Sequence, residues 1–436
     1  MQIEKRIGPN KHFLSMLNET RRKIMKLKSL EIQTYRSCIK TVFPLQNELT
    51  GLIGINGAGK SNILNAILLL RKICSTGSYL RHEKDPSYNH CRIIAEIVDS
   101  KKSVLIDGKI FFETDERNND DVQISDIKWK FNEKSNWKNI PMEIIVYRER
   151  FKYGFSHPSA LSRRSMSERW LFSKQKTKEL VSENEFQTII DIANFFNGIS
   201  YYSASQFSDP SRSPVSIELE EDRPLRKSRF FSGHEKFISD LYKSWKAKDK
   251  QYKRYLNTVN KEGIGLIDDI SFNEVNMPSS SYEVQSGGKI KTIERNRLLI
   301  IPSFSVDGSQ LSPNQLSEGT FKTLALLFYI LTDESKLLLI EEPEVCIHHG
   351  LLNSIIALIK SQSKQKQIVI STHSDFVLDQ LDPENLVLVK RQPNKGTKAT
   401  LLSKSMSKND YKALREYLEE SGNLGEYWRE GGLDNE

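Results

Sequence analysis

A glycine-rich turn between an apolar strand and an apolar-faced helix is the feature that most constrains this chain. The short apolar run Leu49–Ile53 predicts a strand, Gly54 to Ser61 has the spacing GxxxxGK[ST], and Ser61–Ile73 has helical periodicity. A strand that passes through such a loop directly into a helix is typical of layered α/β folds. We therefore expect an α/β protein with a mixed central sheet.

The same loop predicts a phosphate site. Its glycines let consecutive backbone N–H groups face a phosphate, and the helix N-terminus adds partial positive charge. We expect Lys60 to bridge the β- and γ-phosphates of ATP and the Ser61 hydroxyl to bind Mg²⁺. The alternative is a turn with a structural role only, but such a turn would not require Lys60 and Ser61. The residues predicted to contact the nucleotide in this segment are Asn56, Gly57, Ala58, Gly59, Lys60, Ser61 and Asn62.

A second pattern is an apolar run that ends in carboxylates. Leu337–Ile340 predicts a buried central strand, and Glu341, Glu342, Pro343 and Glu344 follow it directly. Ligands of open α/β folds bind at the carboxyl ends of strands. We expect Glu341 to hold the Mg²⁺ shell, through water, and Glu342 to polarise the water that attacks the γ-phosphate. The alternative is an acidic loop without a chemical role.

Two shorter motifs flank this strand. Leu316 to Thr320 (LSEGT) begins an apolar helix with free N–H groups and a hydroxyl, as an ordinary N-cap also would. His373 follows the apolar strand Gln367–Ser371, where a structural or solvated histidine is the alternative.

In order along the chain, GINGAGKSN, LSEGT, LLLIEEPE and STHSD resemble the ABC ATPase superfamily. More closely, the chain resembles the stand-alone ATPases related to the overcoming-lysogenization-defect (OLD) proteins and the RecF- and SMC-like group. The segment LEIQTYRSCIK is similar to the N-terminal strand of that group, and Glu341 stands where transporters usually carry Asp. Glu344 to His349 resembles the EPExxLHP run of OLD-type ATPases, with His349 in place of proline.

The resemblance implies roles for further residues. The signature residues Ser317, Glu318 and Gly319 of one protomer are expected to close over the γ-phosphate held by a second protomer. His373 is expected to contact that phosphate as a catalytic residue, and Arg36 to lie near the phosphates. Gln206 is the candidate for a glutamine in the Mg²⁺ shell, or else a loop glutamine.

The pattern of strands and helices predicts five segments. They are an N-terminal arm (1–26), an ATPase N-terminal half with an antiparallel β lobe (27–150), a helical insertion (151–296), an ATPase C-terminal half (297–405), and a C-terminal helix with an acidic tail (406–436). In the C-terminal half, strands from Arg297–Ser303 to Leu386–Lys390 alternate with helices, so we expect them to be parallel.

Composition limits where the protein acts. No apolar run approaches the roughly 20 residues of a membrane helix, and the basic N-terminus lacks the apolar core of a secretory signal, so we expect a cytoplasmic protein. The four cysteines have no paired spacing and predict neither disulfides nor a zinc site. A net charge of +8 permits contact with nucleic acid.

Three functional hypotheses remain open. The first, implied by the resemblance, is an ATP-sandwich homodimer or higher homo-oligomer that controls a separate effector nuclease or toxin in a bacterial anti-phage system, such as PARIS, Septu or retron modules. The chain stops after the ATPase, so we expect no Toprim nuclease of the OLD type. The second is a DNA-repair or chromosome-associated ATPase that binds DNA through the basic stretches Arg163–Lys178 and Arg226–Tyr255. The latter has aromatic residues interleaved that could contact bases, namely Phe230, Phe231, Tyr242, Trp245 and Tyr252, although an exposed helical face explains the same residues. The third is a scaffold in which ATP is structural.

Overall fold

The computed structural model describes residues 25–76, 90–99, 102–115, 120–131, 134–139, 183–220, 233–284, 290–345, 347–420 and 422–433. The chain divides into two compact units. Unit 1 comprises residues 1–47, 62–198 and 392–398, and unit 2 comprises residues 48–61, 199–391 and 399–436. The predicted N-terminal arm lies almost wholly outside the described residues, as does the basic stretch Arg163–Lys178.

Unit 1 is built on an antiparallel sheet of order β2-β1-β4-β5-β6-β7. Its strands are β1 (Lys26–Tyr35), β2 (Cys38–Pro44), β4 (Cys91–Val98), β5 (Ser103–Asp115), β6 (Asp120–Phe131) and β7 (Lys138–Asn139). Buried and half-buried side chains alternate along β4, as expected when one face of a sheet is covered. The predicted antiparallel β lobe is confirmed.

Two helices belong largely to unit 1, α2 (Lys60–Thr76) and α5 (Glu183–Asn197). Gly108 of β5 shows how closely α2 packs on the sheet, because a Cβ atom there would lie 2.8 Å from Leu70 Cδ1. The helix therefore covers one face of the antiparallel sheet.

The central sheet has the order β16-β15-β3-β14-β13-β8. Its strands are β3 (Leu49–Ile53), β8 (Ile199–Ser203), β13 (Leu337–Glu341), β14 (Gln367–Thr372), β15 (Leu386–Gln392) and β16 (Gly396–Leu401). From β15 to β8 each neighbouring pair is parallel. Every residue of β3 and β14 is buried, as is typical of parallel strands covered on both faces.

Helices of unit 2 supply most of its core. They are α6 (Gly233–Ala247), α7 (Lys250–Val259), α8 (Glu318–Thr332), α9 (His349–Ser363), α10 (Asp375–Leu378), α11 (Leu402–Ser405), α12 (Lys408–Glu419) and α13 (Leu424–Arg429). The 3₁₀ turns are η2 (Ala204–Phe207), η3 (Pro210–Arg212), η4 (Pro313–Gln315) and η5 (Pro383–Asn385). Apolar residues of α6, α7 and α8 form one cluster with those of the central sheet. Within the described residues, no helix has both the length and the apolar character needed to cross a bilayer.

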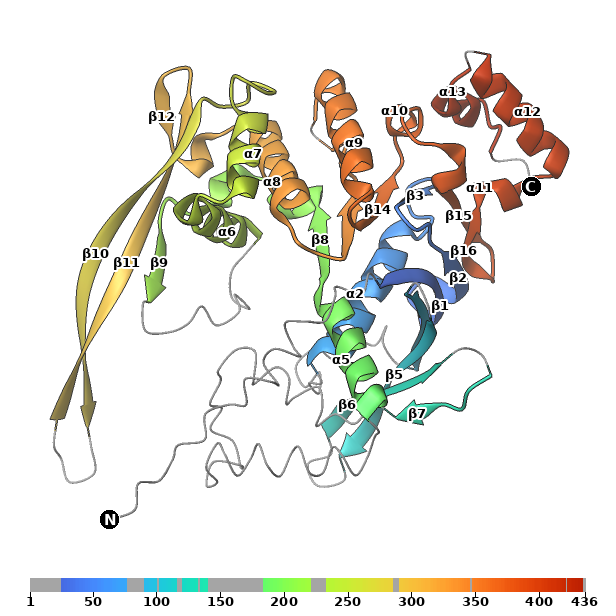
Figure 1. Ribbon diagram of the computed structural model, residues 1–436, viewed down its shortest axis with the longest axis horizontal. Coiled ribbons are helices and arrows are strands. Elements are labelled where there is room, and N and C mark those ends of the chain that lie inside the picture. The colour runs from blue at the N-terminus through green and yellow to red at the C-terminus, as the bar shows by residue number, and fades with distance from the viewer. Residues whose placement is uncertain are drawn as a thin grey trace. The chain divides into compact units, whose positions relative to one another are not determined.

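A second antiparallel sheet in unit 2 corrects one prediction. Its long strands β10 (Asp269–Val284) and β11 (Ile290–Val306) form a ribbon beside α6 and α7, flanked by β9 (Ile217–Glu220) and β12 (Ser309–Leu311) (Figure 1). The predicted parallel strand Arg297–Ser303 lies inside β11, so its parallel placement is wrong. An apolar run predicts a strand but does not identify the strand that pairs with it. The partner of β11 is β10, and its polar sequence gave no clear strand signal.

Where the structure describes it, the segment 151–296 contains helices α5, α6 and α7, as predicted, and also strands. It contains β8, which pairs with β13 in the central sheet, together with β9 and β10. The division of the chain into the five predicted segments stays a prediction.

Removing a ring from the core of unit 2 tests this packing. Phe237 is fully buried, and its ring lies 5.4 Å from that of Phe321 and 5.6 Å from that of Phe328, between centroids. We expect Phe237→Ala to lower the free energy of unfolding by about 3–5 kcal/mol, because it removes apolar contact and leaves a cavity. Urea unfolding measures this loss. The control Val215→Ala, at a side chain that is 53% exposed, should change stability by less than about 0.5 kcal/mol. Equal effects of the two substitutions would contradict the described core.

Candidate nucleotide-binding site

The phosphate loop follows β3 and requires glycine at several positions. Gly57 and Gly59 have φ values of +81° and +109°, in the left-handed region that other residues adopt only with strain. Gly54 packs so closely on β15 that a Cβ atom there would lie 2.3 Å from the carbonyl oxygen of Val389. Glycine at these positions thus serves both the turn and its fit against the neighbouring strand.

Lys60, the first residue of α2, is only 5% exposed. Its ammonium donates hydrogen bonds to the carbonyl oxygens of Gly54, at 2.7 Å, and Ile55, at 3.2 Å. Burial lowers the pKa of Lys60, and the negative charges of Glu342, Glu344 and Glu341 act in the opposite direction. The structure therefore places a buried cation in the field of the three predicted acids.

Glu341 is the last residue of β13, and Glu342 and Glu344 follow it. The Tyr201 hydroxyl, on the neighbouring strand β8, donates a hydrogen bond to Glu341 Oε2. Burial raises the pKa of Tyr201, and the contact with Glu341 adds to this shift. Glu342 has a φ of +47°, uncommon for a residue with a side chain, and its N–H donates to the carbonyl oxygen of Ser371 at 2.9 Å. Backbone strain of this kind clusters at functional sites.

His373 faces the same acids from the end of β14. Its Nδ1 lies 3.2 Å from Glu342 Oε1 and 3.6 Å from Glu344 Oε1. The two residues predicted to be catalytic, Glu342 and His373, are therefore neighbours.

Ser317, Glu318 and Gly319 form the predicted signature at the start of α8. The Ser317 hydroxyl accepts a hydrogen bond from the N–H of Thr320 at 3.1 Å, as the N-cap of this helix. Glu318 Oε1 lies 2.7 Å from the ammonium of Lys322, whose side chain is 3% exposed. The helix start is confirmed, whereas its contact with a nucleotide on a second protomer stays a prediction.

Three further residues were predicted to bind the nucleotide or Mg²⁺, namely Gln206, Arg36 and Asn62. Gln206 is exposed in η2, three residues beyond Ser203, which pairs with Glu341. Arg36 is an exposed residue of the β1–β2 turn in unit 1, with φ +51°. Asn62, also in unit 1, donates a hydrogen bond from Nδ2 to Ser37 Oγ at 2.7 Å. The roles of all three stay predictions.

The donor set fits a magnesium ion that binds together with a nucleotide. Mg²⁺ in such sites takes oxygen ligands from one or two carboxylates and from the substrate phosphates. Glu341 supplies a carboxylate that accepts a hydrogen bond from the Tyr201 hydroxyl, and Ser61 supplies an exposed hydroxyl at the start of α2. Both are oxygen donors of the required kind.

Residues 49–379, from β3 to beyond the acids and His373, match the family model described as "AAA domain, putative AbiEii toxin, Type IV TA system". The chain belongs to this AAA domain family. This family assignment supports the prediction of a P-loop ATPase.

Solved structures similar to this AAA domain chain include SMC heads. The SMC head domain from Thermotoga maritima has 11% identity and a TM-score of 0.40, and covers 86% of this chain and 98% of its own. The Pyrococcus furiosus Smc head with an extended coiled coil, bound to the C-terminal domain of ScpA, has 12% identity and a TM-score of 0.43, covering 91% and 100%. These similarities are too low to assign a function to this chain. The comparison with curated proteins gave no match.

Glu344 is the site residue of this AAA domain that sequence analysis left without a role. Its Oε1 accepts hydrogen bonds from Thr372 Oγ1, at 2.7 Å, and from the N–H of His373, at 3.2 Å. Glu344 thereby fixes the backbone that carries His373, as a positioning residue. Its signals in the sequence were its place as the third acid of the EEPE run and the resemblance of Glu344 to His349 to the EPExxLHP run.

Glu344 also predicts a pH dependence of stability. Burial raises its pKa above the ordinary value of 4.5, so the folded protein holds this proton to a higher pH than the unfolded chain does. Stability must then fall as the pH rises from about 4.5 through the raised pKa. Glu344→Gln keeps an acceptor for Thr372 but does not ionise. We expect this variant to gain stability relative to wild type at pH 7 but not at pH 4, as measured by urea unfolding. A gain of the same size at both pH values would contradict the assignment.

Proposed function

We propose that this protein binds and hydrolyses ATP, with Mg²⁺, as a nucleotide-dependent switch. The observation that carries the proposal is the buried Lys60 ammonium in the field of Glu341, Glu342 and Glu344. A buried ammonium on a loop that also offers backbone N–H groups suits a polyphosphate, and acids at the carboxyl end of β13 suit activation of water.

The hydrolysis step assigns one task to each group. Glu342 accepts a proton from water as the water oxygen bonds to the γ-phosphorus, and the bond from that phosphorus to the β–γ bridging oxygen breaks. Lys60 stabilises the charge that develops on the phosphate oxygens. His373, whose Nδ1 lies 3.2 Å from Glu342, donates to a γ-phosphate oxygen and keeps the carboxylate aligned. The products are ADP and inorganic phosphate.

Replacing the proposed base separates binding from hydrolysis. We expect Glu342→Gln to lower steady-state phosphate release by at least about 100-fold, because the amide cannot take the proton, while MgATP stays bound. Phosphate release and filter-retained ATP measure the two effects. The control Glu334→Gln removes an exposed carboxylate just before β13 and should leave both unchanged. Equal release by Glu342→Gln and wild type would reject the role of Glu342, and negligible release by the wild type would favour the scaffold hypothesis.

We further propose that two protomers sandwich two nucleotides, with Ser317, Glu318 and Gly319 of one chain facing the γ-phosphate of the other. The exposed side chains of Ser317 and Glu318 at the start of α8 support this assignment. Free N–H groups at a helix start bind anions, so this end of α8 suits a phosphate from a partner.

A mixing experiment tests the sandwich. Lys60→Ala and Ser317→Arg should each be inactive alone. In an equimolar mixture, heterodimers hold one intact site, so we expect recovery to about a quarter of wild-type phosphate release if the sites act independently. No recovery, with dimers confirmed by light scattering, would contradict a site shared between protomers.

For the biological role, we propose a regulatory ATPase of a bacterial anti-phage defence system that controls a separate effector nuclease or toxin. The order of motifs supports this role, and the family description links AAA domains of this kind to a toxin–antitoxin system. Co-purification with the product of a neighbouring gene tests it.

Direct DNA binding, the second hypothesis, loses part of its sequence support. Tyr242 and Tyr252 are 4% and 5% exposed, and Trp245 packs on Phe272 with ring centroids 5.2 Å apart. These aromatic side chains therefore serve the core of unit 2 and are not free to stack on bases. Phe230 and Phe231 lie outside the described residues.

A further inference from the structure

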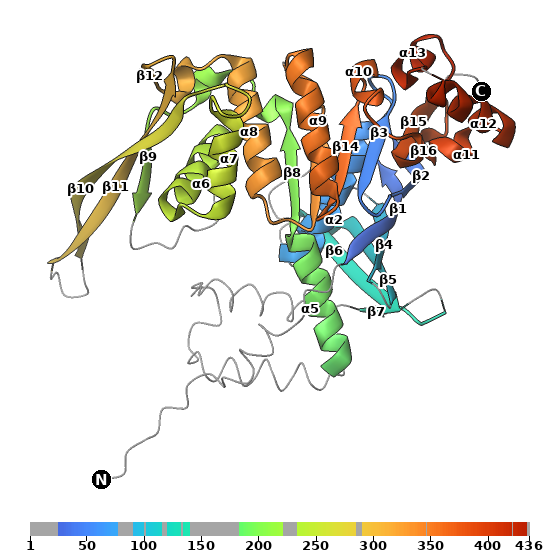
Figure 2. The same cartoon turned by 45° about the horizontal axis from the view of Figure 1, so that its top comes forward.

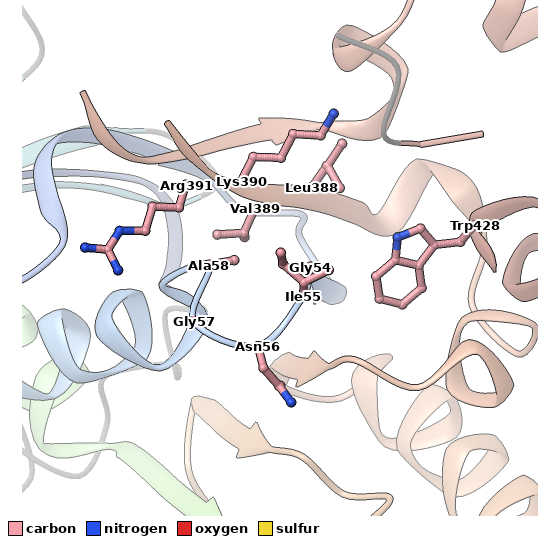
Figure 3. A pocket seen from close by; sticks show the side chains of 10 residues that line it. All are labelled: Gly54, Ile55, Asn56, Gly57, Ala58, Leu388, Val389, Lys390, Arg391 and Trp428. Atoms are coloured by element: carbon pink, nitrogen blue, oxygen red, sulfur yellow. The ribbon is translucent and has the colours of Figure 1, made fainter. Parts of the chain in front are cut away.

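A pocket of about 360 Å³ adjoins the phosphate loop (Figure 3). The loop backbone from Gly54 to Ala58 forms one wall, and Leu388, Lys390 and Arg391 of β15 form another. Trp428 of α13 completes the lining, with its indole on the Ile55 side of the loop in this view. Its size is that of a small-ligand site.

The order of the strands places this pocket opposite the acids. β3, which leads into the phosphate loop, lies between β14 and β15. His373 follows β14, and Glu342 follows β13 beyond it, so the terminal phosphate of a bound nucleotide belongs on that side. The nucleoside end must then extend the other way, toward β15, where the pocket lies.

The lining suits a planar heterocycle. Trp428 is half-buried and offers an aromatic face, and Ile55, which is 65% exposed, lines the same pocket as an apolar residue. Stacking on an aromatic side chain accepts any base, because every base has a π-face. Lys390 and Arg391 of β15 line the same pocket.

The wall that carries Trp428 is fixed in place. The N–H of Gly425 donates to Asp379 Oδ1 at 2.6 Å, and Arg429 Nε lies 3.0 Å from Asp375 Oδ2. A Cβ atom at Gly425 would lie 2.4 Å from the carbonyl oxygen of Asp375, so α13 packs tightly on α10. Figure 2 shows the two helices side by side. These contacts hold in place the helix that carries Trp428.

We propose that this pocket binds the base of ATP and that Trp428 stacks on it. The inference rests on the proposed function, since it completes the same nucleotide site. Helix α13 would then take part in substrate binding. Trp428 would contribute to the affinity for the nucleoside but not to the affinity for the phosphates.

The test compares two ligands, MgATP and magnesium tripolyphosphate, which has no base or ribose. We expect Trp428→Ala to weaken MgATP binding about tenfold, the typical loss on removing one stacking partner, and to leave tripolyphosphate binding unchanged. Gly425→Ala, which displaces α13, should have the same pattern. Lys60→Ala should weaken both ligands. Unchanged tripolyphosphate binding by the two helix variants also shows that their phosphate site is folded.

Tryptophan fluorescence supplies a second readout. MgATP should quench the wild-type emission, Trp428→Phe should abolish the quench, and the control Trp245→Phe should retain it, because Trp245 packs on Phe272 away from the pocket. If the wild type binds MgATP but Trp428→Ala binds it equally well, the proposal that Trp428 stacks on the base is wrong, and the proposed ATPase activity is unaffected. If the wild type binds neither ligand, the proposed function itself fails.

Discussion

The site depends on one interaction, the placement of a buried ammonium at the bend between β3 and α2. Burying a charge is costly unless partners compensate for the lost water. For Lys60 these partners are two carbonyl oxygens of its own loop and three nearby carboxylates. The glycines of the loop, the end of β13 and the histidine after β14 can all be understood as parts that hold this cation and its counter-charges within reach of a polyphosphate.

The central sheet makes this arrangement possible. Parallel strands bring their carboxyl ends to one edge, so residues distant in sequence, such as Lys60, Glu342 and His373, meet there. Two further elements extend the site in opposite directions. Glu344 fixes the strand end on the acid side, whereas α13 brings Trp428 to the pocket beside β15.

Sequence alone predicted the parts of this fold with strong local signals. The bounds of β3 and the positions of α8, β13 and β14 follow from apolar runs with clear punctuation, and the phosphate loop has a fixed spacing. It did not predict the antiparallel pairing of β11, because periodicity identifies a strand but not its neighbour. It also left Glu344 and Trp428 without roles. Both lie near residues that are distant in sequence: Glu344 accepts a hydrogen bond from Thr372, and Trp428 lines one pocket with the loop at Gly54. No local sequence pattern records such proximity.

The most direct test of the account is calorimetric titration of MgATP into the wild-type protein and into a Lys60→Met variant, which keeps a long apolar stem without the charge. We expect saturable binding heat for the wild type and an affinity at least about 100-fold weaker for the variant, because charge-assisted contacts to the phosphates are lost. Equal affinities of the two proteins, or no binding heat for the wild type, would contradict it.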